Sequence, residues 1–244
     1  MNLVHDAVPQ PQDPQDPQRQ APQPHAPPRW STQPEGDPRP RAFRAALPVL
    51  AWSLLGGLLF GVLTNIGQGW LPGAWNSIVN SGAVWSVAAF VAGALVAARR
   101  PFAVAPVAGL LAEAGLVVGY YAYAEFGFNR QGMGMLFYPL LWLGMAFLAG
   151  PLFGVAGAWW RRNEDWRRRA VAVAGLAGVF GMESVHYAWT LHYAPQAWAC
   201  LALAVLLPLV MPRTHKERGV ALLCTAAFSF VAYVVVYRGL LSGA

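Results

Sequence analysis

The feature that most constrains this chain is a series of apolar runs, each about as long as a membrane-spanning helix, separated by short polar stretches. Read in windows of about 19 residues, the sequence contains seven such runs. An α-helix rises about 1.5 Å per residue, so about 20 residues cross a hydrocarbon layer of about 30 Å. The runs cover residues 45–66, 82–98, 102–124, 133–160, 170–191, 197–211 and 220–237.

Two of the runs, residues 82–98 and 197–211, are shorter than the others. The fourth run is long enough to tilt, or to kink at Pro139 and Pro151. If residues 197–211 form a re-entrant segment instead of a span, the count falls to six and the C-terminus changes side.

The composition is that of a membrane protein. Of the 244 residues, 56% are apolar or aromatic and 11% are charged, whereas an ordinary soluble domain carries about a quarter charged residues. Roughly 200 residues follow the polar start of the chain, which is enough for several spanning helices and for very little else. These numbers exclude a water-soluble globular enzyme.

The basic residues lie between the apolar runs, which is typical of cytoplasmic loops. If the N-terminal segment is cytoplasmic, the basic clusters all fall on the cytoplasmic side, and Arg130 and Arg238 fall outside. Seven spans alternate in this way, so we expect a multi-pass protein of the plasma membrane with its C-terminus outside. The net charge of +6 therefore does not indicate nucleic-acid binding. The inside clusters are Arg39, Arg41 and Arg44; Arg99 and Arg100; the arginines of residues 161–169; and Arg213, Lys216 and Arg218.

The first 44 residues differ in composition from the rest of the chain. Pro alternates there with Gln, Asp and Ala, so the segment cannot propagate a helix and lacks the apolar residues of a core. No apolar run precedes Ala45, so the segment is not a signal peptide. We expect a disordered cytoplasmic tail over residues 1–44, either a solvated leader or an arm that docks into a polyproline-binding groove.

Two carboxylates lie at membrane depth. Glu113 is roughly 18 Å, and Glu183 roughly 20 Å, from the cytoplasmic end of its own helix. A charge at this depth costs about 2.5 to 3.5 kcal/mol, and no Lys or Arg lies at the same depth. Desolvation therefore favours protonated carboxyl groups that donate hydrogen bonds. Carboxyl groups that exchange protons in mid-membrane are what a proton-coupled carrier requires.

Further polar side chains extend from these carboxylates toward the outer boundary. Glu183, His186 and Thr190 are spaced i, i+3 and i+7, which places them on one face of a helix. Tyr120 follows Glu113 on its helix, and Asn65 and Gln68 end a stripe on the first helix. The pattern predicts a polar cavity in the outer half of the membrane. The alternative is that these groups satisfy one another as structural hydrogen bonds. The candidate residues are Asn65, Gln68, Glu113, Tyr120, Glu183, His186 and Thr190.

Glycines recur at the spacing that lets helix backbones approach closely in lipid. We expect them to lie in helix contacts. They are Gly57 and Gly61; Gly115 and Gly119; Gly150 and Gly154; and Gly175, Gly178 and Gly181.

Motifs of known enzyme classes are missing from the sequence. It contains no HExxH, GxSxG, GxxxxGK[ST] or CxxC pattern. Glu183 and His186 form a single Glu-x-x-His, whereas di-iron bundles carry two copies and two further carboxylates. Cys200 and Cys224 lie in apolar runs and are expected as buried apolar residues. We therefore predict no catalytic residue, metal or cofactor, and an enzyme that uses Glu183 and His186 is a less favoured alternative.

Several strings resemble a family of small bacterial polytopic membrane proteins that is classed as a domain of unknown function. The resemblance covers residues 45–244 and is most specific between Gly67 and Trp85. It implies a membrane location and about seven spans, and it implies no activity. The strings are GQGWLPGAWNSIVNSGAVW, AFVAGALVA, GLVVGYYAYAE, GPLFGVAGAWWRR and GMESVHY.

The sequence as a whole predicts an all-α, seven-span transmembrane bundle over residues 45–244, preceded by a disordered tail. The first functional hypothesis is a small proton-linked carrier or a solute-binding membrane component. The alternative is a non-catalytic accessory or assembly protein of the membrane. The expected partners are the lipid bilayer, a small solute, and a protein that binds the loops or the tail.

Overall fold

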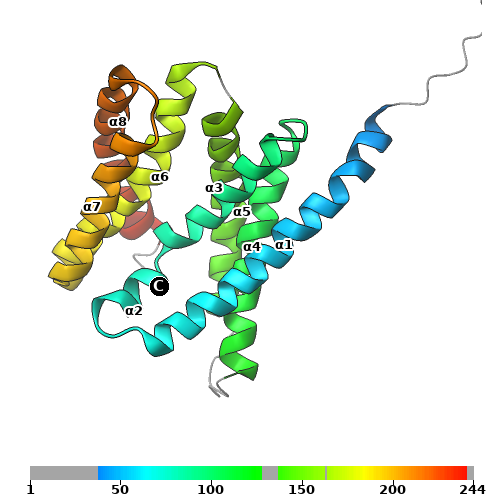
Figure 1. Cartoon of the computed structure of the whole chain (residues 1–244). Coiled ribbons are helices and arrows are strands. Elements are labelled where there is room, and N and C mark those ends of the chain that lie inside the picture. The colour runs from blue at the N-terminus through cyan, green and yellow to red at the C-terminus, as the bar shows by residue number, and fades with distance from the viewer. Residues whose placement is uncertain (1–37, 128–136, 163, 241–244) are drawn as a thin grey trace, which may run out of the picture. The chain divides into compact units, whose positions relative to one another are not determined.

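The computed structural model describes residues 38–127, 137–162 and 164–240, with side chains from Ala46 to Gly239 inside these ranges. Every regular element in this part of the chain is a helix and no strand occurs, which confirms the all-α prediction (Figure 1). Residues 1–37 of the predicted tail, Arg130 and the first four residues of the fourth apolar run lie outside the described residues. The elements are α1 (Pro38–Trp70), α2 (Ala74–Val79), α3 (Gly82–Ala97), α4 (Val104–Phe126), α5 (Phe137–Arg162), α6 (Trp166–His186), η2 (Tyr187–Leu191), α7 (Ala194–Val210), α8 (His215–Tyr233) and η3 (Val234–Leu240).

Each of the seven apolar runs coincides with a helix of the structure. Five helical segments are long and apolar enough to cross a membrane, namely those of α1, α4, α5, α6 with η2, and α8 with η3. The other two runs form α3 and α7, which have 16 and 17 residues and so extend about 24 to 26 Å. These are the two runs that the sequence analysis predicted to be short.

Helix α1 begins earlier than the predicted end of the tail. It starts at Pro38, so residues 38–44, which the sequence analysis assigned to a disordered tail, are helical. Pro38 and Pro40 fall in the first turn, where a backbone N–H has no intrahelical acceptor and proline therefore costs little. The composition of the first 44 residues predicted no helix, but proline at this position is compatible with a helix start.

Glycines allow the long helices to approach one another closely. A Cβ atom added at Gly57 or Gly61 of α1 would lie 2.0 or 2.1 Å from a backbone oxygen of α4. Gly154 of α5 faces α4 in the same way, and Gly181 of α6 faces Ser229 of α8. The prediction that these glycines lie in helix contacts is therefore confirmed. Gly175 is different, because a Cβ atom there would meet no atom within 4 Å.

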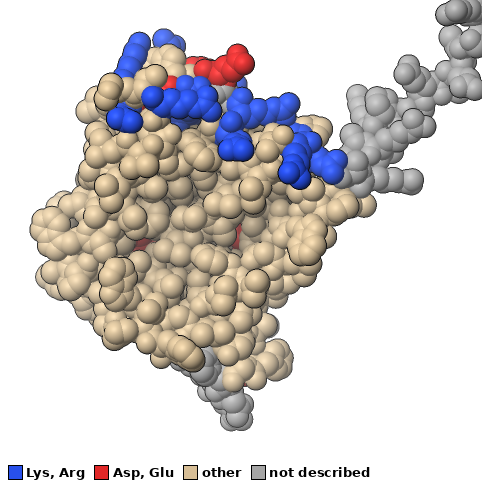
Figure 2. Space-filling view, in the orientation of Figure 1, with Lys and Arg blue, Asp and Glu red and all other residues tan. Residues whose placement is uncertain are grey.

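The loops at the basic end are joined by side-chain hydrogen bonds. Arg162 at the end of α5 donates to the backbone oxygen of Arg100 at 2.9 Å, and Trp160 Nε1 donates to the backbone oxygen of Met211 at 3.4 Å. The loops after α3, α5 and α7 thus lie at the same end of the molecule. Lys and Arg gather at this end, and the rest of the visible face carries almost none (Figure 2).

A buried ion pair joins α6 to α8 near that end. Arg169 donates from Nη2 to Glu217 Oε1, and Glu217 is 1% exposed. The other Glu217 oxygen accepts the backbone N–H of Arg213 at 2.9 Å, and Thr214 caps the start of α8 by accepting the N–H of Glu217 at 3.2 Å. Arg169 is therefore a structural residue, whereas the sequence analysis counted it among the loop cations.

We predict that Glu217→Ala lowers the free energy of unfolding by about 3–5 kcal/mol, because buried Arg169 would lose its ion pair with Glu217. Arg168→Ala is the control, since Arg168 contacts Asp165 at 3.9 Å in an exposed pair that contributes about 0–1 kcal/mol. Denaturant unfolding in mixed micelles measures both variants. Equal losses in the two variants would contradict a structural role for the buried pair.

We also predict that Gly154→Ala destabilises the bundle by about 1–3 kcal/mol, because the new Cβ atom would lie 2.4 Å from the Ala105 oxygen. Gly144→Ala, on the same helix, places its Cβ atom in open space and is expected to be neutral or stabilising by up to about 1 kcal/mol. Thermal unfolding in one detergent compares them. A Gly154→Ala variant as stable as Gly144→Ala would show that α4 and α5 can separate at no cost.

Candidate functional site

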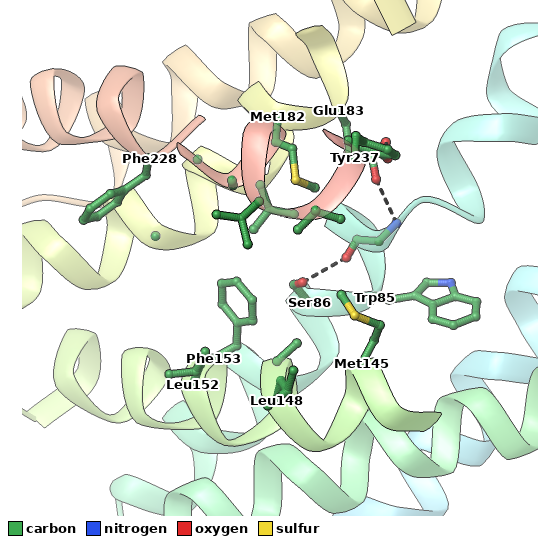
Figure 3. Close-up of a pocket in the computed structure, with 18 of the residues that line it drawn as sticks. Trp85, Ser86, Met145, Leu148, Leu152, Phe153, Met182, Glu183, Phe228 and Tyr237 are labelled. Atoms are coloured by element: carbon green, nitrogen blue, oxygen red, sulfur yellow. Dashed lines mark hydrogen bonds between the residues drawn. The ribbon is translucent and has the colours of Figure 1, made fainter. Parts of the chain in front are cut away.

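A cavity of about 440 Å³ lies among α3, α4, α5, α6 and the α8–η3 segment. Most of its wall is apolar, and both predicted membrane carboxylates, Glu113 and Glu183, line it. In the close-up, Met182, Glu183 and Tyr237 lie across the cavity from Leu148, Leu152 and Phe153 of α5 (Figure 3). The two carboxylates, which come from helices 70 residues apart in sequence, thus share one site.

Glu183 is held by two hydrogen bonds. Its Oε1 atom accepts the backbone N–H of Gly82 at 3.1 Å, and its Oε2 atom accepts the hydroxyl hydrogen of Tyr237 at 2.9 Å. Gly82 is the first residue of α3, where backbone N–H groups have no intrahelical acceptor. Glu183 therefore caps α3 from a neighbouring helix, at the end where the helix dipole favours negative charge.

Tyr237 connects Glu183 to His186. Its phenol ring stacks on the imidazole of His186 with a centroid distance of 3.7 Å and an interplanar angle of 2°. His186 is half-buried, and its Nδ1 atom has no hydrogen-bond partner in the described part of the chain. The stacking and the hydrogen bond together determine where the Tyr237 hydroxyl lies.

Thr190 extends the same face toward the end of the helix. It is exposed, and its hydroxyl lies 3.2 Å from that of Tyr233. The structure thus places Glu183, His186 and Thr190 on one side, against the α8–η3 segment, as their spacing predicts. Neither His186 nor Thr190 lines the cavity itself.

Glu113 is buried beside the cavity. It is 5% exposed and lines the cavity from α4. Its Oε2 atom has no hydrogen-bond partner among the described residues. Buried polar atoms are nearly always hydrogen-bonded, so Glu113 leaves the site with an unused hydrogen-bonding group next to free volume.

Asn65, Gln68 and Tyr120 form a separate cluster between α1 and α4. Asn65 Nδ2 donates to the Tyr120 backbone oxygen at 3.1 Å, and the Tyr120 hydroxyl donates to Gln68 Oε1 at 2.5 Å. None of the three lines the cavity. Trp85 lies between the two groups, since it lines the cavity and its ring centroid is 5.5 Å from that of Tyr120.

Sequence reasoning missed the aromatic partners of the carboxylate site. Tyr233 and Tyr237 are spaced i, i+4 in the last apolar run, a spacing that places both on one helix face. Trp85 and Trp142, whose ring centroids are 5.5 Å apart, line the cavity next to Glu113 and Glu183. Only the Tyr233 and Tyr237 spacing was available as a signal, because the pairing of Trp85 with Trp142 requires knowledge of which helices are neighbours.

Metal ligands do not gather at the site. Within the described ranges, no group of three or more His, Cys, Asp or Glu side chains is placed to hold a metal ion. Cys200 is buried, Cys224 is half-buried and neither forms a disulfide. The Glu-x-x-His of Glu183 and His186 thus has no third ligand in this part of the chain.

Comparison with known proteins identifies a family. The chain belongs to a family described as a family of unknown function (DUF6518), which matches residues 40–242. This confirms the resemblance to an uncharacterised family, over nearly the same residues as expected. No curated protein and no solved structure matches the chain.

We predict that Tyr237→Phe lowers the free energy of unfolding by about 1–3 kcal/mol, because one oxygen of buried Glu183 loses its donor. Tyr233→Phe is the matched control. It removes a hydroxyl whose partner, Thr190, is exposed, and we expect a loss of no more than about 1 kcal/mol. Thermal unfolding of both variants tests the difference. A larger loss of stability in Tyr233→Phe than in Tyr237→Phe would contradict the importance of the Tyr237 hydroxyl as the partner of Glu183.

Proposed function

We propose that the protein is a solute-binding membrane component, and specifically a small proton-linked carrier, that binds its solute in the cavity next to Glu113 and Glu183. The observation that carries the proposal is the buried Oε2 atom of Glu113, which lies beside free volume and has no hydrogen-bond partner in the ranges that the structure describes. The expected solute is small, because ligand cavities range from about 300 to 1,000 Å³ and this one measures about 440 Å³.

The arrangement in the membrane follows from charge. We propose seven spans, with α3 and α7 as the short ones, the basic end in the cytoplasm and the C-terminus outside, in the plasma membrane. Lysine and arginine are enriched in cytoplasmic loops, and the loops after α3, α5 and α7 lie together at one end. In this arrangement Arg238 near the end of η3 is on the outer side.

The free-energy cost of burying Glu113 favours a functional role for this residue. A buried carboxyl group without a partner costs free energy, whether it is charged or protonated. A Gln or Leu at this position would avoid the charge. A residue that costs stability and contacts a cavity is typical of sites that bind ligands or exchange protons.

Glu183 has a different role in the proposal. Its two hydrogen bonds connect the start of α3 to the α8–η3 segment, so a change in its protonation alters the contact between these helices. Protonation of Glu183 removes the charge that favours the end of α3. We infer that Glu113 meets the solute and that Glu183 couples the proton to helix position.

The alternative is a non-catalytic accessory or assembly protein whose polar groups only stabilise the bundle. The cluster of Asn65, Gln68 and Tyr120 favours it, because these residues satisfy one another by hydrogen bonds. On this alternative the cavity is a packing defect, and the loops or the tail bind a protein partner.

We predict that solutes from a small-molecule library raise the melting temperature of the purified protein by mass action, and that Gly175→Leu abolishes the rise. Gly175 lines the cavity and has open space at its Cβ position, so a leucine there has room for its Cβ atom and occupies volume that the solute would need. Gly144→Leu is the control, because Gly144 also has open space but is not among the cavity-lining residues.

Each variant is measured at about pH 6 and about pH 8, together with Glu113→Gln. We expect the stabilisation to depend on pH in the wild type and in Gly144→Leu, and to lose that dependence in Glu113→Gln. A library that stabilises no variant, or one that stabilises Gly175→Leu as much as the wild type, would favour the accessory protein.

A further inference from the structure

We propose that the solute is a hydrophobic amine, bound as a cation, which reaches the cavity from the hydrocarbon layer between α5 and the α8–η3 segment. This inference rests on the proposed function and adds the chemical class of the solute and its route. It follows from how polarity and exposure vary across the cavity wall.

The mouth of the cavity is apolar and exposed. Leu148 and Leu152 of α5 are 60% and 68% exposed, and Val231 and Val235 opposite them are 56% and 52% exposed. All four belong to helical segments that are long and apolar enough to span a membrane. In a bilayer such an opening faces acyl chains, and a solute that passes through it must be soluble there.

The floor of the cavity is buried and carries the polar groups. Ser86, Glu113 and Glu183 are each no more than 5% exposed. The Ser86 hydroxyl donates to the Gly82 oxygen at 2.9 Å, and Glu183 accepts from Gly82 and Tyr237. Glu113 is the carboxylate with an oxygen left to accept a hydrogen bond. A bound molecule therefore places its apolar body at the mouth and its polar group at the floor.

The acidic groups of the floor select a basic solute. The cavity lining contains two carboxylates and no Lys, Arg or His. Trp85 and Trp142 add aromatic rings to the wall, and an indole face attracts a cation. A neutral amine that enters from the hydrocarbon layer accepts the proton of the Glu113 carboxyl group. The resulting ammonium group then donates an N–H to the carboxylate and compensates its charge. A carboxylate or phosphate group cannot form this ion pair.

The experiment compares three probes with the same apolar body: aminoadamantane, adamantanol and adamantane carboxylate. Each is titrated calorimetrically into the protein in nanodiscs, and the heat of titration into empty nanodiscs is subtracted. We expect aminoadamantane to bind at least tenfold more tightly than adamantanol and the carboxylate not to bind. Glu113→Gln should remove the preference, so that this variant binds aminoadamantane no more tightly than adamantanol. Glu164→Gln, at an exposed loop carboxylate, is the control and should retain the preference.

The outcomes separate this inference from the proposed function. If adamantanol binds as tightly as the amine and Gly175→Leu abolishes both, the cavity is a solute site and the cationic class is wrong. If aminoadamantane does not bind, or its preference survives Glu113→Gln, the inference is also overturned. The proposed function is then judged by the solute library alone.

The route is tested by the rate of binding. Leu152→Trp narrows the mouth and should slow association of aminoadamantane at least fivefold with little change in Kd. Leu140→Trp, at another exposed α5 position outside the lining, should leave the rate unchanged. Equal association rates in the two variants would overturn access between α5 and α8.

Discussion

Backbone contact between helices at glycine is the constraint on which the rest of this structure depends. In lipid, helices associate through packing and hydrogen bonds, because acyl chains are as apolar as the side chains that face them. Here Gly57, Gly61 and Gly154 bring α1 and α5 against the backbone of α4. This approach fixes α4, and with it the depth at which Glu113 meets the cavity. The position of the site therefore depends on glycines, which let the helix backbones come into contact.

The cavity lies where the close contact between α6 and α8 ends. Gly178 and Gly181 of α6 face Phe228 and Ser229 of α8, but Gly175, nearer the basic end of α6, faces open space. Helix α6 and the α8–η3 segment, which both line the cavity, are joined by the buried pair of Arg169 and Glu217 near one end and by Tyr237 and Glu183 near the other. The two polar contacts hold the wall of the cavity at both ends while its middle remains apolar and accessible.

The sequence predicted the helices well and the site in part. Hydropathy is a local signal, so each apolar run coincides with a helix, including the short α3 and α7. Depth along a helix is also local: Glu113 and Glu183 were expected at similar depths, and in the structure both line one cavity. Which helices are neighbours is not a local property. The contact of Tyr237 with Glu183 and the separate cluster of Asn65, Gln68 and Tyr120 therefore could not be derived from the sequence. Proline is common both at helix starts and in disordered tails. The prolines of residues 38–44 therefore do not distinguish the two, and in the structure α1 begins at Pro38.

The π-helical turns η2 and η3 have a consequence for how this site can change in evolution. A π-helical hydrogen bond spans five residues, whereas an α-helical one spans four, so such a turn holds an additional residue. Tyr237 meets Glu183 from within η3, and Thr190 meets Tyr233 from within η2. Loss of a single codon in either segment would restore α-helical winding and rotate these side chains away, while the hydropathy of the segment stayed the same. The segments η2 and η3 can therefore accept amino-acid substitutions far more easily than the insertion or deletion of a residue.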